Sequence, residues 1–139
     1  MEDRMPGCVL RVASADFQVD DFLKTSTLHP CNVYRRAEPR GQTGKLNNKT
    51  GMTVIVSEAN GDALARQVQD AAAFLEQNRG EINRLRSYVG NEGITLDFGI
   101  WSKEVLGQYN YLPPRLLRLA GELEVGIELS IYHRDECSP

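Results

Sequence analysis

The segment that decides the fold reads Ile94-Thr95-Leu96-Asp97-Phe98-Gly99-Ile100-Trp101. Apolar side chains occupy every second position in it, and the positions between them are polar, small or aromatic. Because successive side chains of a strand point to opposite faces, this period predicts a β-strand with one face turned to a core. Three more segments repeat the pattern, over residues 8–13, 51–58 and 124–133. Four such strands indicate an antiparallel or mixed sheet covered by helices on one side.

The segments between the strands have helical periodicity. Apolar residues recur at three- and four-residue steps over residues 62–77 and again over 80–89, which predicts amphipathic helices. A short helix is predicted over residues 19–24, and Pro113-Pro114 opens another, because proline is tolerated in the first helical turn. The sequence leaves open whether 62–77 and 80–89 form one kinked helix. It predicts an α+β fold: a two-layer sandwich with about four strands in a mixed or antiparallel sheet, helices on one face, and a ferredoxin-like core with an inserted helical pair.

Composition places the chain among globular proteins. It has 139 residues, of which 41% are hydrophobic and 25% charged, with a formal net charge of −3. This mix predicts a single domain spanning the whole chain, with an ordered core over about residues 7–133. The longest apolar run, near Met52–Val56, is too short for a membrane helix, and the first six residues lack the apolar core of a secretory signal. Three cysteines, Cys8, Cys31 and Cys137, form no paired framework, so we expect a reducing, cytoplasmic setting.

The sheet face away from the helices carries the first candidate site. Its outward positions include Arg11, Asp97, Trp101, Glu128 and Tyr132. One interpretation is a solvated face on which Arg11 pairs across strands with Asp97 or Glu128. The other is a surface for a protein partner or a second copy, anchored by Trp101 and Tyr132, because large aromatic side chains and arginine dominate binding hot spots. Trp101 lies at a strand end, where it could instead cap the core.

A basic loop provides the second candidate site. Residues 35–49 carry five basic side chains against one acidic one, although the chain as a whole is acidic. With the preceding aromatic residue, the candidate residues are Tyr34, Arg35, Arg36, Arg40, Lys45 and Lys49. Three interpretations stay open: a solvated loop, a protein contact, or a site for an anion or nucleic acid with Tyr34 stacked on a base. The sequence does not decide whether the loop over residues 35–50 is ordered.

Motifs for catalysis and cofactors are weak. The segment Gly41-Gln42-Thr43-Gly44-Lys45-Leu46 lacks both the four-residue gap between glycines and the hydroxyl residue after lysine that a phosphate loop requires. His29 and Cys31 flank a proline without an evident orienting group, and Asp97 and Glu128 are the carboxylates that could lie together. We therefore predict no catalytic residues, no metal site and no cofactor. An enzyme using His29, Cys31 or the Asp97/Glu128 region is kept as a third hypothesis.

The chain also resembles a known family. The segment that carries the resemblance is His29-Pro30-Cys31-Asn32-Val33-Tyr34-Arg35-Arg36-Ala37-Glu38, which is similar to the family's signature of proline, then aromatic, basic, basic, small and glutamate. Two helices, the alternating strand and Leu112-Pro113-Pro114-Arg115-Leu116-Leu117 follow in a similar order before the last strand. On these motifs, about residues 8–133 resemble bacterial proteins grouped as domain of unknown function 4279. The resemblance implies a small bacterial cytosolic protein with a non-enzymatic role, and it carries over no catalytic residues.

These observations lead to an order of hypotheses about function. The first is a cytoplasmic protein-binding module of a regulatory or toxin-neutralising type, present as a monomer or a weak homodimer. It depends on the absence of a convincing catalytic set, the mixed open face and the charge concentrated in one loop. The alternative is anion or nucleic-acid binding through residues 35–49, and no membrane association is expected.

Overall fold

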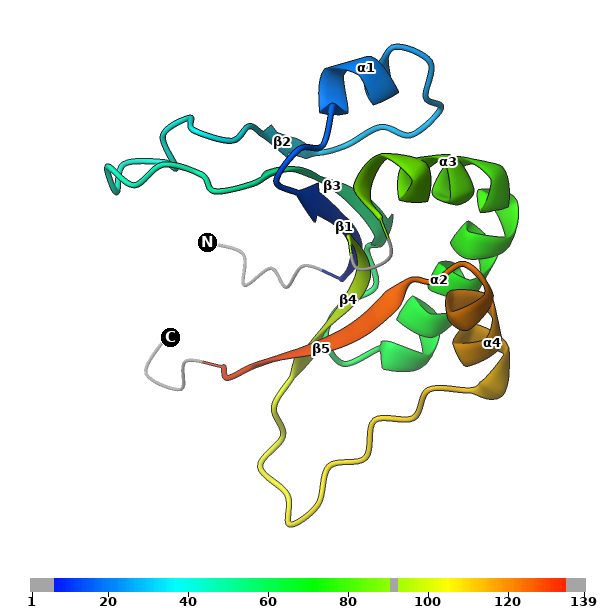
Figure 1. Cartoon of the computed structure of the whole chain (residues 1–139). Helices are drawn as coiled ribbons and strands as arrows, with labels where there is room; N and C mark the ends of the chain where they lie inside the picture. Colours follow the sequence, from blue (N-terminus) through cyan, green and yellow to red (C-terminus); the bar gives the residue numbers. More distant parts are fainter. Residues whose placement is uncertain (1–6, 91–92, 135–139) are drawn as a thin grey trace.

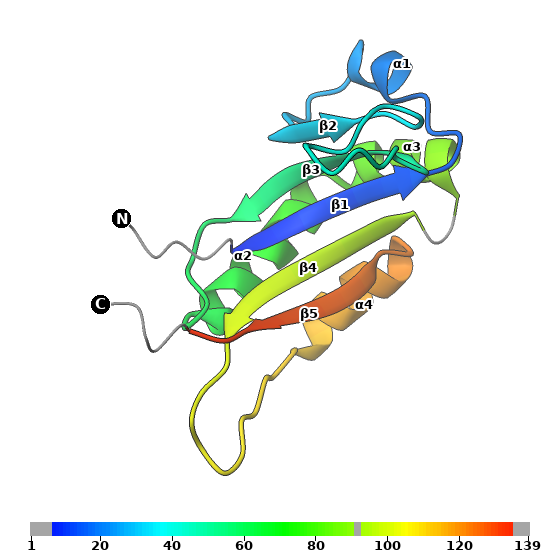
Figure 2. The same ribbon diagram turned by 90° about the vertical axis from the view of Figure 1, so that its left-hand side faces the viewer.

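Five strands form one open, mixed sheet. The computed structural model describes residues 7–90 and 93–134. The strands are β1 (Cys8–Ser14), β2 (Asn32–Tyr34), β3 (Thr50–Ser57), β4 (Ile94–Trp101) and β5 (Gly126–Tyr132), in the spatial order β2-β3-β1-β4-β5 (Figures 1 and 2). The four strands predicted from alternation are confirmed. The fifth, β2, has three residues and is too short to show a period of its own.

Helices cover one face of this sheet, as the one-sided apolar pattern predicts. The helices α2 (Leu64–Gln77), α3 (Arg79–Val89) and α4 (Pro114–Glu122) lie on the same side, and α1 (Val19–Leu23) lies beside β2 (Figure 1). Figure 2 looks onto the opposite face, with the strands in front and the helices behind. The fold is a two-layer α+β sandwich. Within the described part of the chain, no helix lies over the second face.

The last strand gives the topology its particular form. A ferredoxin-like core has the element order β-α-β-β-α-β, which β1, α1, β2, β3, the pair of α2 and α3, and β4 reproduce. Helix α4 and strand β5 follow this core, and β5 pairs in parallel with β4. The pairings β1–β3, β1–β4 and β2–β3 are antiparallel. A parallel neighbour requires a long crossover, which the segment 102–125 with α4 supplies. The expected ferredoxin-like core with an inserted helical pair is confirmed, and the added strand β5 lies at the edge of the sheet.

The two central helices are separate. Asn78 lies outside the helical region between them (φ −117°, ψ 26°), and its side-chain amide donates to the Phe74 carbonyl at 2.9 Å. After this break α3 buries Ile82 and Leu85 and places the guanidinium of Arg84 over the Phe22 ring of α1. The sequence left open whether residues 62–77 and 80–89 form one kinked helix, and one non-helical residue divides them into two.

The core contains one long polar side chain. Gln67 in α2 is fully buried, and its amide nitrogen lies 2.9–3.1 Å from the carbonyl oxygens of Ala59, Asn60 and Gly99. These contacts join the turn before α2 to β4. Hydrophobic periodicity does not predict this role, because the acceptors come from segments that the chain brings together only on folding.

Candidate functional site

The charged residues of the open face form a connected network. Arg11 on β1 lies at its centre, with Nη1 3.1 Å from Asp97 Oδ2 on β4 and Nη2 2.8 Å from Glu128 Oε1 on β5. Ser130 Oγ donates a 2.6 Å hydrogen bond to the second oxygen of Asp97. The predicted cross-strand ion pairs are confirmed, and Arg11 bonds to both carboxylates. The arrangement ties three strands together through charge-assisted hydrogen bonds.

The two aromatic residues predicted on this face differ in exposure. Trp101 is 8% exposed, and the guanidinium carbon of Arg134 lies 4.8 Å from the centroid of its ring. Tyr132, opposite Trp101 in the β4–β5 register, is 42% exposed. Because Trp101 is covered, Tyr132 is the one of this pair that offers its ring to a partner.

The basic loop is an ordered hairpin that projects on the open side of the sheet (Figure 1). Backbone hydrogen bonds run from Ala37 N to Asn47 O at 2.8 Å, from Asn47 N to Glu38 O at 2.9 Å, and from Arg40 N to Lys45 O at 2.7 Å. Ala37 adopts a positive φ of 69° at the entry to the hairpin. The paired backbone answers the question of order that the sequence left open for residues 35–50.

Arg35 is engaged within the molecule. Its Nε and Nη2 donate to the two oxygens of Asp20 in α1, at 3.0 and 2.6 Å. This bidentate contact lowers the pKa of Asp20 and raises the pKa of Arg35. It joins α1 to the chain just after β2, so Arg35 supports the fold at this edge of the sheet.

Part of the remaining basic set surrounds a cleft of about 490 Å³ between β2 and the hairpin. Its lining includes Tyr34, Glu38, Arg40, Asn47 and Lys49. The structure brings Tyr34, Arg40 and Lys49 together here, whereas Arg36 and Lys45 are not among the lining residues. Two cations, a phenol and amide groups could donate hydrogen bonds to the oxygens of an anion.

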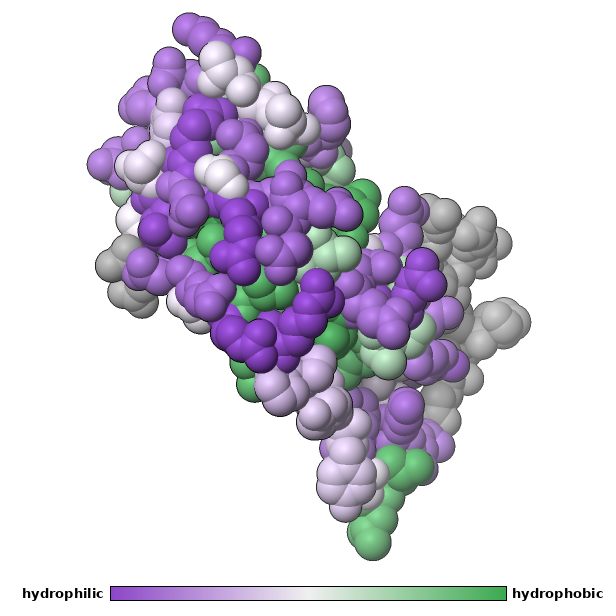
Figure 3. All heavy atoms as spheres, turned by 90° about the vertical axis from the view of Figure 1, so that its right-hand side faces the viewer, coloured by the Kyte–Doolittle hydropathy of each residue, from purple (hydrophilic) through white to green (hydrophobic). Residues whose placement is uncertain are grey.

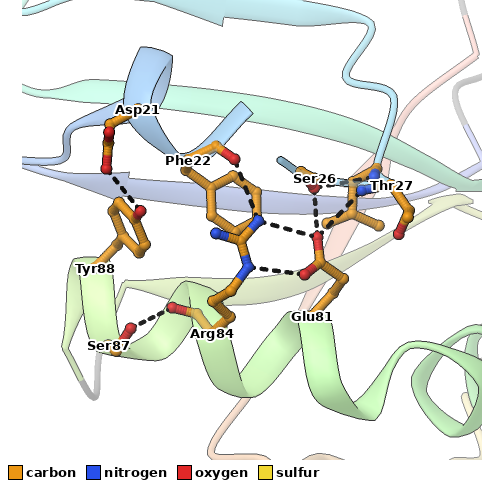
Figure 4. A network of polar contacts seen from close by, with 9 residues as sticks. Asp21, Phe22, Ser26, Thr27, Glu81, Arg84, Ser87 and Tyr88 are labelled. Atoms are coloured by element: carbon orange, nitrogen blue, oxygen red, sulfur yellow. Dashed lines mark hydrogen bonds and ion pairs between the residues drawn. The ribbon is translucent and has the colours of Figure 1, made fainter. Parts of the chain in front are cut away.

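A network between α1 and α3 is the most connected polar cluster that sequence reasoning missed (Figure 4). Arg84 Nε lies 2.9 Å from Glu81 Oε1, its Nη2 donates to the Phe22 carbonyl at 3.2 Å, and its guanidinium lies 4.2 Å from the centroid of the Phe22 ring. Ser26 Oγ donates to the second oxygen of Glu81 at 2.5 Å, and Tyr88 donates to Asp21 at 2.8 Å. The network fastens α1 and the segment after it onto α3.

The pKa shifts in this network follow from its hydrogen bonds. The bond from Arg84 lowers the pKa of Glu81, and the bonds from Ser26 and the Thr27 amide act in the same direction, against the effect of burial. The hydrogen bond to Asp21 raises the pKa of Tyr88. The three-residue spacing of Glu81 and Arg84 on a predicted helix is the one sequence signal for this cluster.

Exposed apolar side chains gather near the C-terminal part of the fold. Of nine large hydrophobic residues that are exposed in the described structure, seven lie between residues 105 and 132. They are Val105, Leu106, Tyr109, Tyr111, Leu117, Ile131 and Tyr132, and we call them the edge surface. The β4–α4 loop (102–113) projects beyond the sheet in Figure 1, and Figure 3 shows apolar side chains at the tip of this projection.

The base of the β4–α4 loop forms a cleft of about 430 Å³ against α2. Leu64, Val68, Tyr109, Tyr111 and Pro113 are among the residues that line it. Tyr109 and Tyr111 nevertheless remain 94% and 72% exposed. Alternation and helical periodicity do not detect this surface, because both signals find side chains that are buried.

Two members of the edge surface, Ile131 and Tyr132, lie on β5, which is an edge strand of the sheet. Ser102 N donates to the Tyr132 carbonyl at 2.7 Å, so the backbone groups of Tyr132 face β4. Successive residues of a strand turn these groups to opposite sides. Those of Ile127, Leu129 and Ile131 therefore face away from the sheet, and they have no hydrogen-bond partner among residues 7–90 and 93–134.

The histidine and cysteine candidates lie apart from these features. Cys31 is exposed and its amide donates to the Thr53 carbonyl at 2.8 Å, and neither Cys31 nor His29 lines the two clefts above. Cys8 is fully buried, and burial raises the pKa of its thiol well above the ordinary value. Cys137 lies outside the described residues. In the described part of the chain, His, Cys, Asp and Glu side chains form no group of three that could hold a metal ion.

The comparisons with known proteins identify a sequence family for this chain. A family model described as Domain of unknown function (DUF4279) matches residues 4–134, which is most of the chain. Searches of curated proteins and of solved structures find no match. Among the described helices, none has the length and apolar character needed to cross a membrane.

Proposed function

The chain belongs to the DUF4279 family, and from this premise we propose that it is a non-enzymatic module that works by binding another protein chain. The observation that carries the proposal is the edge surface. Of the nine large hydrophobic side chains that are exposed in the described residues, seven lie on the β4–α4 loop, α4 and the edge strand β5, and the other two are Leu46 and Ile55. Apolar patches of this kind mark interaction sites on soluble proteins.

The chemistry of the edge surface fits a polypeptide ligand. The free edge of β5 offers backbone donors and acceptors in a row, and an added strand would satisfy them. Tyr109, Tyr111 and Tyr132 contribute rings with a polar tip, and tyrosine is one of the residue types enriched among the hot spots of protein interfaces. Main-chain bonds would supply affinity and the neighbouring side chains would supply specificity, as regulatory and toxin-neutralising partners require.

The open face is less suited to be the primary contact. Its central charges, Arg11, Asp97 and Glu128, are already bonded to one another. A partner that used them would have to break these bonds and leave charges without their counterparts. We therefore place the binding surface at the β5 edge and treat the open face as its border.

Partner capture with matched variants tests this proposal. Ile131 on β5 and Ile55 on β3 are 52% and 50% exposed, so Ile131→Lys and Ile55→Lys place the same charge in similarly exposed strand positions. The proposal expects a protein that copurifies in stoichiometric amounts with the wild type and with Ile55→Lys, and is lost with Ile131→Lys. A partner retained equally by both variants would contradict the assignment of the surface.

A second function has one specific observation in its favour. Arg40 and Lys49 border the same cleft as Tyr34, which supports binding of an anion or of single-stranded nucleic acid. Titration with oligonucleotides at two salt concentrations tests it, because contacts to phosphate weaken steeply as salt rises. Binding that is lost in Arg40→Ala but retained in Arg118→Ala, a change on α4 outside the cleft, would support this function. An absence of binding at low salt would remove it.

A further inference from the structure

We infer that the partner at the β5 edge is a second copy of this chain, joined by antiparallel pairing of β5 with β5 about a twofold axis at Leu129. The inference rests on the proposed function and names the occupant of its surface. The twofold axis would stand perpendicular to the sheet and extend it from five strands to ten, with the helices of both copies on the same side.

The residues of β5 that turn their backbone N–H and carbonyl groups away from β4 are placed suitably for this pairing. Ile127, Leu129 and Ile131 are the residues whose backbone groups face outward, as the Ser102–Tyr132 bond shows. A twofold axis at Leu129 places Leu129 opposite itself and Ile127 opposite Ile131 of the other copy. All three residues then meet as hydrogen-bonded pairs, each exchanging both an N–H and a carbonyl bond. An axis at Ser130 would also pair outward-facing residues, Leu129 with Ile131, but it would leave Ile127 opposite His133, beyond the end of β5.

The side chains agree with the same register. On the helix side, Ile127 and Leu129 pack against the core and Ile131 is half exposed, and pairing would cover Ile131 with Ile127 of the other copy. On the open side, Glu128 would stand opposite Ser130 rather than opposite another Glu128, so like charges do not meet. Tyr132 would stand opposite Gly126, where an aromatic ring covers the strand position that lacks a side chain.

The exposed side of helix α4, which lies beneath the strands, could also pack against the second copy. Glu122 lies 3.3 Å from Arg79 at the start of α3, so that side of α4 faces the other helices. Leu117, five residues earlier, lies on the opposite side and is 48% exposed, because five residues turn a helix by about 140°. Gly121 lies one turn after Leu117, and a Cβ there would meet no atom within 4 Å. Two copies of α4 could approach each other closely along this side.

The β4–α4 loop would contribute a third contact. It leaves β4 near the end where Tyr132 closes β5, and it projects beyond the sheet (Figure 2). In an antiparallel pair that end lies beside the start of β5 in the other copy. The exposed side chains of Val105 and Leu106 would then lie next to the partner's turn between α4 and β5. The pairing therefore uses the parts of the edge surface that strand bonding alone would leave uncovered.

The edge also lacks the features that keep strands from pairing. Exposed edges in monomeric proteins are commonly short, bulged, or protected by lysine and proline. β5 has seven residues with one charge, Glu128, and its register to β4 runs without a shift. A strand of this length and composition is a template for another strand, and its own sequence matches it in antiparallel orientation.

Sedimentation of the purified chain over a concentration series tests the inference. The wild type and Ile55→Lys are expected to form dimers, and Ile131→Lys is expected to weaken association about tenfold or more, because it places a charge among interface apolar groups. Circular dichroism of both variants checks that they remain folded. A wild type that stays monomeric at the highest attainable concentration would overturn the inference, as would a dimer unaffected by Ile131→Lys.

Cysteine crosslinking tests the register. In a background in which Cys31 and Cys137 are replaced by serine, Leu129→Cys is expected to oxidise to a disulfide-linked dimer, because opposed residues at the axis lie within disulfide reach. Tyr132→Cys is the control, since two copies of residue 132 would lie about 20 Å apart. Efficient crosslinking through residue 132, or none through 129 in a chain that does dimerise, would overturn this register.

The two proposals fail in different ways. Failure of the dimer with retention of a different, Ile131-dependent partner removes the inference and leaves the proposed function standing. A dimer that forms and captures nothing else supports the inference and restricts the protein-binding role to self-association. A monomer whose captured partner is insensitive to Ile131→Lys counts against both.

Discussion

The sheet ends in β2 on one side and in β5 on the other, and the two edges differ in length, charge and cover. β2 has three residues, leads into the charged hairpin and is joined to α1 through the Arg35–Asp20 pair. β5 has seven residues, one charge and a border of exposed apolar side chains. A sheet edge is a template for another strand unless it is shortened, charged or covered. The difference shows that α1 is fastened to one edge, whereas the other edge has no strand beside it among the described residues.

Proline substitution within β5 should produce the largest effect and tests which residues face outward. Ser130→Pro removes an N–H that faces β4 and the hydroxyl bonded to Asp97, and should lower the free energy of unfolding by about 3 kcal/mol. Ile131→Pro removes an N–H that faces outward and should cost about 1 kcal/mol or less. Denaturant unfolding at low protein concentration measures both. Equal losses would show that the assigned backbone phase is wrong.

Disrupting the contact of β2 with the sheet should produce the next largest effect. A Cβ on Gly51 would lie 2.4 Å from the Tyr34 hydroxyl and 2.7 Å from the Val12 carbonyl, and the backbone oxygen cannot move away easily. Gly51→Ala should therefore destabilise the protein by about 1–3 kcal/mol. Gly80→Ala is the control, because a Cβ there meets nothing within 4 Å. Thermal unfolding that leaves Gly51→Ala as stable as Gly80→Ala would contradict this account of the edge.

The network that holds α1 over the β2 edge predicts a pH dependence. The pKa of Glu81 is lowered in the folded state from its ordinary value of 4.5. Its contribution to stability is therefore complete above pH 4.5 and is lost as the pH falls through the folded-state value. Glu81→Gln should be less stable than the wild type at neutral pH, and the difference should shrink in acid. Melting curves across this range, with Glu104→Gln as control, check the sign; a difference that is constant with pH would refute it.

The smallest effect is expected at the Arg35–Asp20 pair, which is exposed. Pairs of this kind contribute little to global stability, so Arg35→Ala should leave the melting temperature nearly unchanged. It should nevertheless speed hydrogen exchange in α1 and the hairpin, because their link is removed. Arg66→Ala, which breaks an exposed pair within α2, should not do so. Unchanged exchange in Arg35→Ala would show that the β2 edge is held by other contacts.

The sequence predicted more of the fold than of the site. Alternation located β1, β3, β4 and β5, and the apolar stripes located α2, α3 and α4, because both patterns report burial within one short segment. The Arg11 ion pairs were also predictable, since they follow from which strand face each residue occupies. For Trp101 the sequence left two positions open, on the open face or capping the core, and its ring is covered, with Arg134 approaching it from another segment.

The contacts of the basic loop could not be predicted from sequence patterns either. Composition found its charge, but its cationic side chains have different surroundings in the structure. Arg35 bonds to Asp20, whereas Arg40 and Lys49 line the cleft beside Tyr34. Hydrogen bonds within the hairpin and to α1 decide this division, and they join residues up to fifteen positions apart. No periodic pattern carries that information.

By itself, the sequence determined that this protein contains a sheet with one apolar face covered by helices, because the spacing of apolar residues indicates which side chains are buried. The tertiary structure alone decided the order of the strands, the parallel placement of β5 and therefore which edge is free. Those features depend on how α4 returns the chain to the sheet and on contacts between distant segments. Local side-chain patterns cannot encode them, because every strand order buries the same alternating faces.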